Sequence, residues 1–212
     1  MNGPSAYQLD VLAQAMRGVA ESDVAAYQDL KRLFAEKDDA GRGEFRRAFE
    51  RYYGLYAGGV TQAWRDRYFE LLFGLTLTEG ADPYTPLLRS LYAIPRHKGD
   101  CALQFSFVSK LVAMHDERYP LYDRYVSGFF GIAPPAIGGL SFRIAGFVAH
   151  MQWLRQTYAA WAQDAAFQQV IASLRDRYPC LQSVAVPRLA DMLVWAAGKS
   201  GLECQPETEQ RA

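Results

Sequence analysis

The chain has 212 residues, of which half are hydrophobic and 14% are aromatic, and its 23 basic side chains are balanced by 23 acidic ones. This balance argues against a nucleic-acid protein that relies on a bulk basic field, because neutralising phosphates is the main source of such affinity; it leaves room for a local basic face. The length predicts one generous domain, or two small lobes packed together.

The cysteines and the apolar runs bear on where the protein works. Cys101, Cys180 and Cys204 are odd in number and share no metal-binding or redox spacing, which is typical of a reducing cytosol. No charged leader precedes an apolar core, and no apolar run reaches about eighteen residues. We therefore expect a soluble cytoplasmic protein that does not bind a membrane.

Apolar residues at helical spacing predict helices along the whole first half of the chain. In chain order these helices cover residues 6–21 with Ser5 as the cap, about 22–37, 43–59, 60–77 and 84–93. The stretch 38–43, which contains two glycines, predicts a turn. Residues 74–78 carry a weak strand pattern, but no sheet is expected from it.

Residues 101–114, CALQFSFVSKLVAM, are mostly apolar around the whole helical circumference, which is typical of a core helix. Lys110 lies in this run, with Ser106 and Met114 among its helical neighbours. Burying an ammonium is costly, so a lowered pKa is expected for Lys110. A lysine that has lost its proton near neutral pH can act as a nucleophile or form a Schiff base.

Asp123 follows the Tyr119–Pro120 break and is expected at the start of the next helix. There its carboxylate can cap the helix or face back toward Lys110. A purely structural interpretation stays open, with Lys110 extending its amine to the surface and Asp123 serving only as a helix cap.

The second half of the chain predicts three further helices, over residues 141–162, 165–177 and 186–198. Residues 131–139, GIAPPAIGG, form the clearest break and predict a lobe boundary, and residues 203–212 predict a disordered tail. The expected fold is all-α, with two packed helical lobes around a central buried helix in a single domain over residues 1–202.

The segment Phe105–Val126, FSFVSKLVAMHDERYPLYDRYV, resembles the helix-hairpin-helix superfamily of DNA base-excision glycosylases. It is most similar to divergent members with an 8-oxoguanine-glycosylase-like fold, which carry a Ser/Thr-Lys pair before a Pro-x-x-Asp element. The C-terminal PRLADMLVWAAGK is weakly similar. The resemblance implies that Lys110 attacks C1′ of a damaged nucleotide in double-stranded DNA and that Asp123 stabilises the charge on the sugar. It implies no metal or organic cofactor.

The Leu-Pro-Gly-Val-Gly hairpin with which that family grips a DNA phosphate is absent here, and its nearest substitute is the loop Ile94–Gly99. We expect Arg96, His97 and Lys98 of this loop, together with Arg124, to hold phosphates. If the loop is a degenerate hairpin, Lys98 takes the nucleophile's place. We favour Lys110, because an exposed lysine stays protonated and is a poor nucleophile.

Tyr122 and Tyr125 flank Asp123 and are candidates for stacking on an extruded base, although such tyrosines also commonly pack against a neighbouring helix. The three histidines, His97, His115 and His150, have no metal-ligand spacing, and the sequence has no nucleophile elbow, P-loop or dinucleotide fingerprint. Two hypotheses follow. The first is a glycosylase/lyase; the alternative is a non-catalytic helical module that binds a protein or a nucleic acid.

Overall fold

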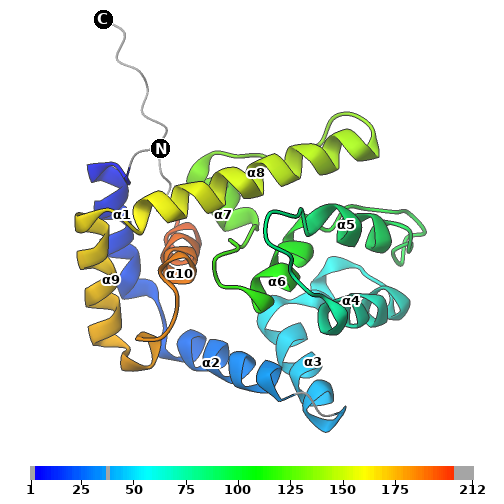
Figure 1. Ribbon diagram of the computed structural model, residues 1–212, viewed down its shortest axis with the longest axis horizontal. Coiled ribbons are helices and arrows are strands. Elements are labelled where there is room, and N and C mark those ends of the chain that lie inside the picture. The colour runs from blue at the N-terminus through cyan, green and yellow to red at the C-terminus, as the bar shows by residue number, and fades with distance from the viewer. Residues whose placement is uncertain (1–2, 37–38, 203–212) are drawn as a thin grey trace, which may run out of the picture. The chain divides into compact units, whose positions relative to one another are not determined.

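The computed structural model describes residues 3–36 and 39–202, and within these ranges every regular element is helical (Figure 1). The expected all-α fold is therefore confirmed. Residues 75–78, where the strand pattern was weak, form the loop after α4 (Gln62–Gly74). The expected disordered tail, residues 203–212, lies outside the described residues.

The chain divides into two compact units. One, the 22–116 unit, is a continuous stretch from Ser22 to Asp116; the other, the terminal unit, combines the residues up to Glu21 with those from Glu117 onward. The segment 131–139, which we expected to be a lobe boundary, lies inside the terminal unit, where it links α7 (Arg124–Phe130) to α8 (Leu140–Trp161). The packing of two lobes around one central helix stays a prediction.

In its described residues, 22–36 and 39–116, the 22–116 unit contains five α-helices and a short 3-10 turn. These are α2 (Glu21–Ala35), α3 (Asp39–Tyr53), η2 (Leu55–Gly58), α4, α5 (Tyr84–Tyr92) and α6 (Phe105–His115). The turn predicted at 38–43 is wrong, because α3 already begins at Asp39 and both glycines of the stretch are helical. A helical glycine costs roughly 1 kcal/mol relative to alanine. The complete burial of Phe45 and Phe49 on the same helix outweighs that cost.

Helix α6 is the core of the 22–116 unit, since all of its residues except Ser106 and His115 are buried. It begins at Phe105 rather than at Cys101, which is exposed. The Tyr68 hydroxyl of α4 donates to the Phe107 carbonyl over 2.8 Å, and His115 Nε2 hydrogen-bonds the Leu72 carbonyl over 2.7 Å. Helix α6 is thus bound to α4 near both of its ends, and it also packs on α5.

The part of the terminal unit that the structure describes also contains five α-helices. These are α1 (Ala6–Ala15), followed by the 3-10 turn η1 (Met16–Gly18), then α7, α8, α9 (Ala165–Arg177), the 3-10 turn η3 (Pro179–Leu181) and α10 (Val186–Lys199). The cap expected at Ser5 is confirmed, because its hydroxyl accepts from the Gln8 amide and the Gln8 side chain accepts from the Ser5 amide. This helix ends at Ala15, earlier than the predicted residue 21.

Helix α10 lies at the centre of the terminal unit and packs on α1, α7, α8 and α9 (Figure 1). Its contact with α7 is the most extensive of these, and Gly198 lets the backbone of Tyr125 approach. A Cβ atom at Gly198 would lie 2.7 Å from Tyr125 Cβ and 3.0 Å from Tyr125 Cα. The position of α7, and of Asp123 at its start, is therefore tied to α10.

None of the described helices combines the length and the apolar content that crossing a membrane requires.

Candidate functional site

Lys110 is a buried lysine on the core helix of the 22–116 unit, with 5% of its surface exposed. Its Nζ donates to Ser106 Oγ over 2.6 Å and to the Ser106 carbonyl over 3.3 Å, both one helical turn earlier. The same nitrogen lies 5.5 Å from the centre of the Tyr53 ring and 6.0 Å from that of Phe107. A hydroxyl, a carbonyl and two aromatic faces therefore lie beside the amine.

These surroundings act on the charge of Lys110 in opposite directions. Withdrawal from water disfavours the ammonium, whereas the aromatic faces and the two oxygen acceptors favour it. The lowered pKa expected from the sequence stays a prediction. The sequence placed Ser106 among the helical neighbours of Lys110, and the structure makes its hydroxyl a hydrogen-bond partner of the amine. Ser109, directly before Lys110, instead donates its hydroxyl to the Ser106 carbonyl over 3.0 Å. The four-residue spacing from Ser106 to Lys110 carried this contact in the sequence.

Asp123 is the N-cap of α7, as one of the two sequence alternatives predicted. Its Oδ1 accepts from the amides of Tyr125 and Val126, over 2.9 and 3.1 Å. The side chain is partly exposed, and in the described part of the chain its second oxygen, Oδ2, accepts no hydrogen bond. One oxygen thus orders the helix start while the other is left for water or a ligand. Asp123 belongs to the terminal unit and Lys110 to the 22–116 unit.

The loop expected to hold phosphates is a tight turn closed by Arg96 and Asp100. The Arg96 guanidinium donates to both carboxylate oxygens of Asp100, and the Arg96 amide donates to the Asp100 carbonyl over 2.8 Å. The carboxylate raises the pKa of Arg96, and the guanidinium holds the pKa of Asp100 below its ordinary value. His97 and Lys98 are exposed at the turn. Arg96 is therefore already engaged, and Lys98 is the cation that the turn presents to solvent.

The two candidate stacking tyrosines differ in their surroundings. Tyr122 is 4% exposed and packs edge-on against Phe147, with ring centres 5.4 Å apart, and burial raises its pKa. The Tyr122 ring therefore packs in the core, as the alternative interpretation predicted, and in this geometry it is not exposed for stacking on a base. Tyr125 is partly exposed, and the Arg124 guanidinium lies 4.6 Å above its ring and donates to its hydroxyl. Arg124 and Tyr125 thus form one partly exposed cation–aromatic pair.

Sequence reasoning missed two charged residues of the terminal unit, Arg188 and Asp191, which are 2% and 1% exposed on α10. Burial raises the pKa of Asp191 to about 7, against the lowering effect of the Arg188 guanidinium and of the Leu121 amide. The signal for this pair was an arginine and an aspartate three residues apart in the otherwise apolar run PRLADMLV.

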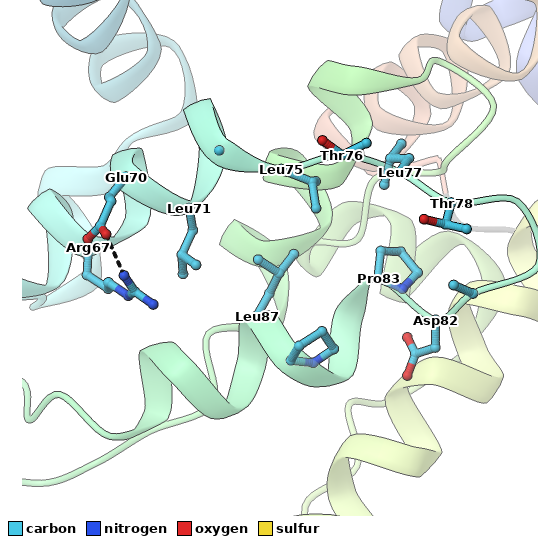
Figure 2. Close-up of a pocket in the computed structure, with 13 residues that line it drawn as sticks. Arg67, Glu70, Leu71, Leu75, Thr76, Leu77, Thr78, Asp82, Pro83 and Leu87 are labelled. Atoms are coloured by element: carbon cyan, nitrogen blue, oxygen red, sulfur yellow. Dashed lines mark ion pairs between the residues drawn. The ribbon is translucent and has the colours of Figure 1, made fainter.

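A groove of about 420 Å³ lies within the 22–116 unit, between α4, the loop that follows it and the start of α5 (Figure 2). Figure 2 shows the Arg67–Glu70 ion pair at one end of the groove and Asp82 at the other, with leucine side chains between them. None of the site residues expected from the sequence lines it.

Within residues 3–36 and 39–202, no three His, Cys, Asp or Glu side chains gather in a way that could hold a metal ion. Comparisons with protein-family models, with curated proteins and with solved structures found no match.

Proposed function

We propose that the protein is a DNA glycosylase/lyase that acts on a damaged base extruded from a duplex, with Lys110 as the nucleophile. The observation that carries the proposal is the burial of Lys110 beside Ser106 and Tyr53. An amine withdrawn from water is the usual form of a nucleophilic lysine. In a solvated surface position it stays protonated.

The chemistry requires an amine that has given up its proton. Its lone pair attacks C1′ of the sugar, and the bond from C1′ to the base breaks with its electron pair leaving on the base, which takes a proton. The nitrogen then loses a proton and its lone pair forms the C=N bond as the C1′–O4′ bond breaks; O4′ takes the electron pair and a proton, which leaves a Schiff base between Lys110 and C1′. Asp123 stabilises the positive charge that develops on the sugar, for which its Oδ2 is suited because capping engages only Oδ1.

The remaining residues of the proposed DNA interface are chosen because their side chains are exposed to solvent. Lys98 and His97 at the turn, and Arg124 on α7, are the candidates for phosphate contacts. Arg96 serves mainly to hold the turn through Asp100. Tyr125 keeps the stacking role.

The test is borohydride trapping on a panel of damaged and abasic duplexes, because borohydride reduces a Schiff base to a stable amine. We expect an adduct with the wild type, none with Lys110→Ala, and an adduct at saturating DNA with Lys98→Ala. An adduct that survives Lys110→Ala and disappears with Lys98→Ala would transfer the nucleophile to the turn.

The alternative is a non-catalytic helical module that binds a protein or a nucleic acid. It is favoured by one observation: the capping contacts of Asp123 and the hydrogen bonds of Lys110 within α6 account for both residues structurally. The module is supported if the wild-type protein forms no adduct on any duplex and does not bind a duplex even at low salt.

A further inference from the structure

The segment that leads into Asp123 is held by side chains of α10. Arg188 Nη2 donates to the Tyr119 carbonyl over 3.2 Å, and the Leu121 amide donates to Asp191 Oδ2 over 2.9 Å. The two side chains are joined by an ion pair, with Arg188 Nη1 2.7 Å from Asp191 Oδ2. Tyr119 and Leu121 of this segment are thus both hydrogen-bonded to the same buried ion pair.

The same segment is attached to α10 on either side of this pair. Before it, Glu117 Oε2 accepts from the Ala185 amide over 2.8 Å, directly before the first turn of α10. After it, the backbone of Tyr125 rests on Gly198 near the other end of α10. Asp123 lies between these attachments, so its backbone has little freedom to move relative to α10.

Net stability gives a poor account of this arrangement. Removing two charges from water costs about as much free energy as their attraction returns, so well-packed apolar side chains often stabilise a core equally well. A buried pair is better explained by what it orients, and here it orients the backbone at Tyr119 and Leu121, four and two residues before Asp123.

We propose that Arg188 and Asp191 are positioning residues, which hold residues 119–121 on α10 and thereby set where Asp123 presents its carboxylate. This inference deepens the proposed function and rests on it for the catalytic role of Asp123. Neither residue contacts a substrate in the proposal. Tyr158, fully buried on α8, belongs to the same cluster, because the Asp191 carboxyl group raises its pKa in addition to burial.

The experiment measures hydrogen–deuterium exchange of peptides covering residues 119–127 in the full-length protein, with no substrate present. The main variant is Arg188→Met with Asp191→Leu, which removes both attachments while keeping apolar volume in the core. A second variant, Arg188→Lys, keeps the charge but not the planar fork that reaches both Asp191 and the Tyr119 carbonyl. The matched control is Arg67→Met with Glu70→Leu, which removes an i,i+3 ion pair of the same 2.7 Å length on the surface of α4.

We expect the main variant to raise exchange in 119–127 by about tenfold or more, because two hydrogen bonds are lost. Exchange in α1 and α9 and the melting temperature should change little, and the control should leave 119–127 unaffected. Unchanged exchange in 119–127 overturns the proposal. A uniform rise over the whole terminal unit with a lower melting temperature also overturns it, since the pair would then be a stability element only.

The kinetic readout separates this inference from the proposed function. If the wild type forms the borohydride adduct, the main variant should lower the single-turnover rate at least tenfold with duplex affinity unchanged, and Arg188→Lys should recover part of the rate. A wild type that forms no adduct refutes the proposed function and with it the catalytic role of Asp123, whereas the exchange data still decide whether the pair holds the segment.

Discussion

Lys110 Nζ lies 2.6 Å from the hydroxyl of Ser106, which is half-buried one helical turn earlier on α6. This contact orients the amine along its own helix and gives the proposed nucleophile an acceptor that needs no residue from another element. It also makes Ser106 the first residue to vary.

Ser106→Ala should slow borohydride adduct formation by up to about tenfold without abolishing it, because the neutral amine loses a hydrogen bond that orients it, and such a bond contributes about 0.5–1.5 kcal/mol. The measurement is the single-turnover rate on an abasic duplex. Ser109→Ala is the matched control, because its hydroxyl donates to the Ser106 carbonyl. Equal rates for Ser106→Ala and the wild type would exclude Ser106 from orienting the amine.

Asp123→Asn should preserve folding and DNA binding yet slow base release by orders of magnitude. The asparagine oxygen still caps α7, whereas the negative charge that matters as the sugar becomes positive is lost. Melting temperature, duplex affinity and base-release rate are measured on the same preparation. Normal base release from a folded Asp123→Asn variant would remove Asp123 from the mechanism.

Lys98→Ala should weaken duplex binding and flatten its salt dependence by roughly one unit of slope, as expected for one lost phosphate contact. Arg96→Ala should act differently, because Arg96 closes the turn through Asp100 and its loss alters the loop. The affinity is measured by fluorescence anisotropy across a salt series. A Lys98→Ala slope that parallels the wild type means that Lys98 touches no phosphate.

The stability of the folded protein should depend on pH through Asp191. Its pKa is raised from 3.8 to about 7 in the folded state, so between these values the folded chain holds more protons than the unfolded chain. The stabilisation is therefore fully present below about pH 4 and is lost as the pH rises to about 7, by at most roughly 1.4 kcal/mol per pH unit. Arg188, Tyr158, Asp123 and the Leu121 amide are the groups that face it.

Asp191→Asn should remove this part of the pH dependence, because asparagine does not titrate. Urea denaturation between about pH 4 and pH 7 gives the free energy of unfolding of both proteins. The difference between wild type and variant isolates the contribution of Asp191 from that of the other titrating groups. Parallel stability curves for the two proteins would show that Asp191 keeps its proton affinity unchanged on folding.

Gly198→Ala should destabilise the protein by about 1–3 kcal/mol, since the new Cβ would meet the Tyr125 Cβ at 2.7 Å and its backbone at 3.0 Å. Gly128→Ala on α7 is the control, because nothing lies within 4 Å of its Cβ position and alanine favours the helix. Thermal denaturation compares the two. A neutral Gly198→Ala would mean that α7 can shift on α10.

The sequence alone determined that the described chain is helical and where two of its local caps lie. Residues 165–177 were predicted with their observed bounds, and the caps at Ser5 and Asp123 follow from residue types next to an apolar run. These features depend on spacing along the chain and on hydrogen bonds within a few residues, so one sequence carries them completely. The burial of Lys110 belongs to the same class, because it follows from an apolar circumference.

The tertiary structure decided which groups meet across the chain. The attachment of Leu121 to Asp191 joins residues 70 positions apart, and the burial of Tyr122 depends on where Phe147 of α8 comes to lie. The helical state of residues 39–43 likewise depends on the packing of Phe45 and Phe49, which outweighs the glycine signal. Such contacts arise when whole helices pack together. The packing energy is shared among many side chains that are distant in sequence, and local sequence patterns do not encode these contacts.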